Sequence, residues 1–139
     1  TLGVHCVIVP KDNSAPLNAA AAKTASGGAS IVPVVQVVNL VRCIEQLKQR
    51  GIWIVGTLLE GDQALEQVDL TGNVAIVMGS EERGMRERTT KACDYLVNIP
   101  MPYVNLGFNV SVATGICLYE AIRQRQHLAR LKTETAGAS

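Results

Sequence analysis

The sequence predicts an α/β fold in which a mostly parallel sheet carries helices on both faces. Two observations support this prediction. Short runs of β-branched and apolar residues, typical of buried strands, alternate along the chain with segments of helical character. In addition, the 139 residues are 47% hydrophobic and 18% charged, which suits one folded domain with a substantial core.

Five apolar runs are the expected strands. They cover residues 4–9, 31–37, 52–55, 74–78 and 95–99. The first run stops at Pro10, and Pro33 interrupts the second, which predicts a short strand or an edge strand there. The third and fourth runs end at Gly56 and Gly79, and Pro100 ends the fifth. The first and third runs are apolar on both faces, so we expect these two strands to be buried.

Helices are expected over residues 17–25, 39–50, 85–93 and 109–131. Asn39 is a suitable N-cap for the second helix, and Gly51 can end it. Gly115 lies inside the last helix, where glycine costs about 1 kcal/mol relative to alanine, and this predicts close backbone packing. We expect residues 58–72 to be a connection with one helical turn, and the polar tail 133–139 to be frayed.

Composition argues against several classes of protein. The four cysteines have no metal-ligand spacing, so we expect buried thiols in a reducing compartment: Cys6, Cys43, Cys93 and Cys117. The chain shows no signal peptide and no run of about 18 apolar residues, so we expect a cytoplasmic protein away from membranes. The net charge of +1 gives no global attraction for nucleic acid, so RNA contacts would be local.

Three strand ends carry residues that suit ligand binding: Gly56-Thr57, Gly79-Ser80-Glu81 and Pro100-Met101. Ligands of open parallel sheets bind beyond the carboxyl ends of the strands, where glycine lets backbone approach them closely. Such a cradle suits an adenine or a ribose better than a metal ion. Each feature also has a purely structural interpretation, because glycines form turns, Glu81 can favour a helix start and Asn109 can be an N-cap.

Common nucleotide and hydrolase motifs do not occur. The chain has no GxGxxG after a strand, no GxxxxGK[ST] and no GxSxG. The cysteines lie in apolar strand-like or helix-like stretches, which argues against a Cys/His nucleophile.

Two longer patterns resemble motifs of the SpoU-type RNA 2′-O-ribose methyltransferases of the SPOUT superfamily. Residues 77–85, V-M-G-S-E-E-R-G-M, are similar to that family's second motif, a hydrophobic strand followed by G-x-E-x-x-G-[ML]. Ile-Pro-Met at 99–101, a seven-residue loop and N-V-S-V-A at 109–113 are similar to its third motif. The resemblance covers nearly the whole chain and is strongest to the branch that methylates a guanosine ribose in large-subunit ribosomal RNA.

The resemblance implies a SPOUT methyltransferase catalytic domain over residues 1–132, with a C-terminal trefoil knot. It implies S-adenosyl-L-methionine as the cofactor, ribosomal RNA as the substrate, a homodimer and no metal. The implied reaction is methyl transfer to a ribose 2′-hydroxyl. The implied cofactor-binding residues are Gly56, Thr57, Met78, Gly79, Ile99, Met101 and Phe108. Glu81 and Asn109 are the implied catalytic residues. Arg83 and Arg86 follow the second motif and could meet RNA phosphates, although a solvated helix face explains them equally well.

The chain departs from the family pattern in two places. The first motif, N-x-G-x-x-x-R, which supplies the arginine usually assigned to activating the hydroxyl, is absent. Because the chain starts at Thr1, we expect it to be a piece of a longer protein. The third motif has Gly107-Phe108-Asn109 where the family has S-L-N, so a serine hydroxyl is missing.

Two other functions stay open at this point. The departures favour a catalytically impaired domain that only binds the cofactor or RNA. An unrelated flavodoxin-like regulator would need an acidic residue or a phosphate loop after the first strand, where Pro10-Lys11-Asp12 is a weak candidate.

Overall fold

A computed structural model describes residues 6–10, 34–79, 87–100 and 110–137, and its contacts group the chain into two units, residues 1–43 and 44–139. The first unit holds a parallel pair of strands, β1 (Val7–Pro10) and β2 (Val34–Val37), with Val7 opposite Val34. Both strands were predicted. The side chain of Val7 is nevertheless exposed, so the expected burial is wrong for it; those of Val34 and Val35 are exposed as well, in the strand that was predicted to be short or at an edge. A two-stranded sheet offers too few neighbouring side chains to cover both faces.

The helix α3 (Leu40–Gln49) begins and ends as its sequence predicts. The Asn39 side chain accepts a hydrogen bond from the backbone N–H of Arg42 at 3.1 Å, so Asn39 is the N-cap. Gly51 follows the helix with φ of 80°, a left-handed conformation that favours glycine. The predicted helix at 17–25 lies outside the described residues.

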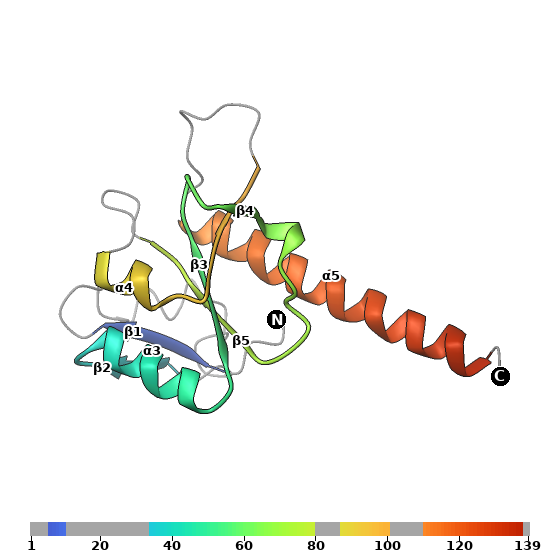
Figure 1. Cartoon of the computed structure of the whole chain (residues 1–139), viewed down its shortest axis with the longest axis horizontal. Helices are drawn as coiled ribbons and strands as arrows, with labels where there is room; N and C mark the ends of the chain where they lie inside the picture. Colours follow the sequence, from blue (N-terminus) through green and yellow to red (C-terminus); the bar gives the residue numbers. More distant parts are fainter. Residues whose placement is uncertain (1–5, 11–33, 80–86, 101–109, 138–139) are drawn as a thin grey trace, which may run out of the picture. The chain divides into compact units, whose positions relative to one another are not determined.

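The second unit is built on a four-stranded parallel sheet with the order β4-β6-β3-β5 (Figure 1). Three of its strands were predicted: β3 (Trp53–Thr57), β5 (Val74–Val77) and β6 (Tyr95–Asn98). The fourth, β4 (Gln63–Ala64), was not predicted, because two residues are too few to show a period. The single turn η1 (Leu65–Gln67) and the short helix α4 (Glu87–Ala92) confirm the predicted helical turn and helix.

The core of this unit lies between the sheet and the first half of α5 (Val110–Gly137). Val55 and Val97 contribute from the central strands, and Cys117 and Ala121 from the helix. The remaining buried members, Leu65, Val68 and Leu70, come from the connection between β3 and β5. Alternation along β3 buries Ile54 as well, so this strand is covered on both faces, as expected of a parallel sheet.

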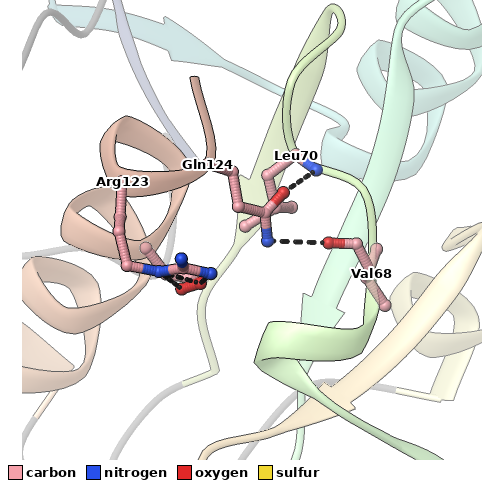
Figure 2. Close-up of polar contacts among 5 residues, drawn as sticks. Val68, Leu70, Arg123 and Gln124 are labelled. Carbon is pink, nitrogen blue, oxygen red and sulfur yellow. Dashed lines mark hydrogen bonds and ion pairs between the residues drawn. The ribbon is translucent and has the colours of Figure 1, made fainter. Parts of the chain in front are cut away.

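Side chains of α5 bind the backbone of that connection (Figure 2). The amide of Gln124 accepts a hydrogen bond from the Leu70 N–H at 2.7 Å and donates one to the Val68 carbonyl at 3.0 Å. Arg125 donates to the carbonyls of Leu70 and Gly72 at 3.2 and 2.8 Å. Arg125 thereby satisfies backbone oxygens of the irregular connection.

The far end of α5 differs from the prediction. The helix continues to Gly137, so residues 133–137 are helical and the expected frayed tail is wrong for them. The hydroxyls of Thr133 and Thr135 donate to the carbonyls one turn back, at 3.0 and 2.9 Å, which accommodates these polar residues within the helix. Gly115 was expected to pack closely, yet a Cβ built there meets nothing within 4 Å in this chain.

Exposure was also mispredicted at two sites. Trp53 is 53% exposed although it lies in an apolar strand, because it stands at the open amino end of β3 beside the ring of Tyr95. Cys6 is exposed, whereas Cys43 and Cys93 are half-buried and Cys117 is buried, so the expectation of buried thiols fails for Cys6.

In the part of the chain that the structure describes, no helix is long and apolar enough to cross a membrane.

Candidate functional site

The carboxyl ends of three strands meet at one edge of the four-stranded sheet, as the sequence predicted. Gly56 of β3 lies opposite Val77 of β5 on one side and Leu96 of β6 on the other. The residues that follow each strand therefore lie at the same edge. Gly56-Thr57, Met78-Gly79 and Ile99 form this edge, which we call the carboxyl edge.

Hydrogen bonds and apolar packing fix these strand ends to one another. The Thr57 hydroxyl donates to the Val77 carbonyl at 3.2 Å and lies 3.7 Å from the Met78 sulfur. It thereby ties the end of β3 to the end of β5. Met78 and Ile99 are half-buried and pack against the core, and Gly56 is buried within the sheet.

A second part of the carboxyl edge was missed by the sequence analysis. The chain leaves β3, crosses the end of β6 through residues 58–62 and enters β4 on the other side. Gly61 lies against the backbone of β6, and the Asn98 side chain donates to the Gly61 carbonyl at 2.8 Å. A glycine in an irregular connection is typical of a turn, so the sequence offered no specific signal for this contact.

Several predicted site residues lie outside the described residues. These are Glu81, Arg83, Arg86, Met101, Phe108 and Asn109, together with Gly107 of the third motif. The predicted residues that the structure does describe lie together at the carboxyl edge: Gly56, Thr57, Met78, Gly79 and Ile99.

The described edge suits binding rather than covalent chemistry. It presents glycine backbone beside the half-buried apolar side chains of Met78 and Ile99, which is the character of a site for a flat, partly apolar ligand. Burial raises the pKa of the Cys93 and Cys117 thiols to about 11, so both are protonated and poor nucleophiles at neutral pH. Among the described residues no three His, Cys, Asp or Glu side chains are grouped as metal ligands.

Comparison with protein families gives a match to the SpoU rRNA Methylase family over residues 1–119. Two similar relatives are the 23S rRNA (guanosine-2′-O-)-methyltransferases RlmB of Pseudomonas aeruginosa and Escherichia coli. The first is 52% identical over 91% of this chain and the second 55% identical over 88%. The chain covers 51% of each relative, so it spans about half the length of these curated proteins.

Solved structures of similar fold include the SpoU methyltransferase AviRb from Streptomyces viridochromogenes in complex with AdoMet. It matches 91% of this chain and 52% of its own, with a TM-score of 0.84 and 29% identity. The TrmH/SpoU tRNA modifying enzyme of A. aeolicus matches 92% of this chain and 65% of its own, with a TM-score of 0.80 and 32% identity.

Proposed function

Because this chain belongs to the SpoU rRNA methylase family, we propose that it forms the catalytic part of an RNA 2′-O-ribose methyltransferase. Its substrate is a guanosine in large-subunit ribosomal RNA, and its methyl donor is S-adenosyl-L-methionine. The observation that carries the proposal is the identity of 52% and 55% to two RlmB enzymes over most of the chain. The AdoMet complex of AviRb, a structure of the same fold, supports the choice of cofactor.

The carboxyl edge is the proposed cofactor site. Gly79 presents backbone to the cofactor and the buried Gly56 lies beneath it in the sheet, while Met78 and Ile99 supply half-buried apolar contact for its adenosine. Thr57, Met101 and Phe108 complete the proposed pocket. S-adenosylmethionine brings the reactive methyl group, so the protein has to bind, orient and shield the reactants rather than form a covalent intermediate.

The remaining proposed roles concern RNA and catalysis. Glu81 helps to hold the active site together, and Asn109 orients the reacting groups. Arg83 and Arg86 bind phosphates, which position an RNA substrate without specifying its sequence. The ribose 2′-hydroxyl needs a base or a stabilising cation, because it is a poor nucleophile at neutral pH. In the family this role is usually assigned to the first-motif arginine, and the N-x-G-x-x-x-R pattern does not occur in this sequence.

The family also leads us to propose a trefoil knot, a homodimer and a cytoplasmic location. The crossing of residues 58–62 over the end of β6 supports the knot, because it forms a bridge of backbone across the end of an inner strand. The homodimer is supported by Val112 and Tyr119, two apolar side chains of α5 that are 51% and 64% exposed and lie two helical turns apart.

Calorimetric titration of the chain with S-adenosylmethionine and S-adenosylhomocysteine tests the cofactor site. Saturable binding is expected, together with a large loss of affinity in Gly79→Val, which places a branched side chain at the strand end. Gly72→Val is the matched control, because Gly72 has open space around it and lies on the connection before β5. A folded chain that binds neither ligand would contradict the proposal.

Transfer of labelled methyl groups to large-subunit ribosomal RNA tests the reaction. The test uses the full-length protein, and a transcript with a 2′-deoxy target nucleotide is the control. Labelling of the normal transcript alone supports the enzyme. Cofactor binding without any transfer would instead support a domain that binds cofactor or RNA without catalysis, which the glycine at position 107 favours.

A further inference from the structure

The connection between β3 and β4 is short, although the two strands run parallel and are not neighbours. It makes no return along the sheet, because Thr57 at the end of β3 and Gln63 at the start of β4 both pair with Val97 of β6. Here β3 ends at Thr57 and β4 starts at Gln63, and β6 lies between them in the sheet. The five residues 58–62, which we call the crossover, therefore pass directly over the end of β6 (Figure 1).

Backbone contacts hold the crossover against β6. The N–H of Leu58 donates to the Val97 carbonyl at 2.9 Å, which extends the pairing of β3 and β6 by one residue. The N–H of Gly61 donates to the Leu58 carbonyl at 3.2 Å and closes a turn. The crossover is thus a tight turn seated on the last peptide groups of β6.

Gly61 is the point of closest approach. A Cβ at this position would collide with the carbonyl carbon of Val97 and would lie 2.7 Å from its oxygen and 2.8 Å from the Asn98 nitrogen. These are backbone atoms of a central strand, so they cannot turn aside as the end of a flexible side chain could. Only glycine allows the two chain segments to cross at this separation.

The Asn98 side chain holds the crossing in place. Its amide nitrogen donates to the Gly61 carbonyl at 2.8 Å, and the contact is partly buried. Asn98 follows Val97, which is fully buried in the core, and precedes Ile99 at the carboxyl edge. One side chain therefore connects the core strand, the crossover and a residue of the proposed cofactor pocket.

We propose that Asn98 and Gly61 are positioning residues for the cofactor. This inference rests on the proposed function and names residues of that same site. The Asn98 amide fixes the crossover on the end of β6, and the crossover is continuous with Gly56 and Thr57 of the pocket. The Thr57 hydroxyl in turn ties the end of β3 to the end of β5. Together the two side chains fix the positions of the ends of β3, β5 and β6 relative to one another.

The physical consequence follows from the geometry of the amide. Asparagine and aspartate have nearly the same shape, but an ionised carboxylate only accepts hydrogen bonds. Asn98→Asp therefore sets an anion against the Gly61 carbonyl oxygen in place of a donor. The crossover has to shift away from β6, and the strand end that carries Gly56 and Thr57 shifts with it. We expect the dissociation constant for S-adenosylhomocysteine to rise on the order of tenfold, as the loss of a partly buried hydrogen bond predicts.

The test measures the S-adenosylhomocysteine affinity of the whole chain by calorimetry, at a temperature where thermal unfolding shows every variant to be folded. Asn73→Asp is the matched control, because it makes the same change of charge on the exposed residue just before β5, at the opposite end of the sheet. Asn98→Asp should bind about tenfold more weakly than the wild type, and Asn73→Asp should bind like the wild type. If Asn98→Asp does not fold, Asn98→Ala takes its place, because it removes the donor without adding charge. Its affinity for S-adenosylhomocysteine is then compared with that of the wild type.

Each outcome decides the inference. A variant at Asn98 that has a lower melting temperature but binds the ligand as tightly as the wild type would show a purely structural residue and would overturn it. The proposed function would then still stand. If the folded wild-type chain binds no S-adenosylhomocysteine, both the proposed function and this inference fall.

Discussion

The two ends of the four-stranded sheet are held together by different means. At the amino end, side chains add contacts to the backbone hydrogen bonds that the N–H groups of Trp53 and Asp94 donate to the carbonyls of Asn73 and Ile54. The Asp94 carboxylate accepts a hydrogen bond from the Ile54 N–H at 2.8 Å and pairs with the Lys48 ammonium at 3.5 Å. Beside them the rings of Trp53 and Tyr95 lie 5.9 Å apart, both on exposed residues.

At the carboxyl end, backbone makes most of the contacts. Gly61 lies directly on the end of β6, and Leu58 extends the ladder to Val97. The side chains of Thr57 and Asn98 also bind backbone carbonyls rather than other charged groups. A side-chain contact can be lost at a moderate cost, whereas a backbone crossing depends on one glycine and on exact spacing. The comparison predicts that changes at the amino end alter stability alone, and that changes at the carboxyl end also alter ligand binding.

The largest expected effect is that of Gly61→Ala. The added methyl group has no space, because its neighbours are backbone atoms of β6. We expect the free energy of unfolding to fall by about 3 kcal/mol or more, at the upper end of the effects of overpacking. Gly72→Ala is the control, since a Cβ there meets nothing within 4 Å and should change the stability by less than about 1 kcal/mol. Urea unfolding measures both, and equal stability of the two variants would contradict the close crossing.

Asp94→Ala should have the next largest effect, at the other end of the sheet. It removes the acceptor of the Ile54 N–H and the partner of Lys48. We expect a loss of about 1–3 kcal/mol in the free energy of unfolding, because a partly buried donor is left unpaired. The affinity of the folded variant for S-adenosylhomocysteine should equal that of the wild type. A clear loss of affinity would break the comparison, because it would show that the amino end also shapes the ligand site.

Thr57→Val should have a smaller effect on stability but should weaken binding. Valine keeps the shape of threonine and removes the hydroxyl that donates to the Val77 carbonyl. We expect a loss of about 1 kcal/mol in stability and several-fold weaker binding of S-adenosylhomocysteine. Thr57→Ser keeps the hydroxyl and should bind like the wild type. If serine and valine bind equally, the hydroxyl does not position the strand ends.

Elements with a local signal in the sequence could be predicted. Asn39 and Gly51 mark the ends of α3 because capping depends on the residues next to the helix. The central strands were predicted because a parallel sheet buries both faces of a strand and so requires a continuous apolar run. The meeting of Gly56, Gly79 and Ile99 at one edge followed from the same topology, since parallel strands end together.

Features that depend on contacts between distant segments could not be predicted. β4 pairs with residues of β6 that are 34 positions away, and Gly61 contacts Asn98 across 37 positions, and the residue types involved give no local signal for either contact. The exposure of a side chain to solvent also depends on contacts between distant segments. Trp53 lies in an apolar run, yet its burial depends on what covers the amino end of the sheet rather than on its neighbours in sequence.

The smallest predicted effect concerns an ion pair on α5, away from both ends of the sheet. Hydrogen bonds from the Arg123 guanidinium, at 2.8 and 3.0 Å from its Nε to the two carboxylate oxygens, hold the pKa of Glu120 below its ordinary value, although burial opposes this shift. A lowered pKa in the folded state adds stability that is present above the pKa of the unfolded chain, about 4.3 for Glu, and is lost as the pH falls through the folded pKa. Thermal unfolding between pH 7 and pH 3 should therefore show that Glu120→Gln is less stable than the wild type at neutral pH, and that the difference shrinks in acid. A difference that stays constant over this range would mean that the Glu120 charge contributes nothing to the stability of the fold.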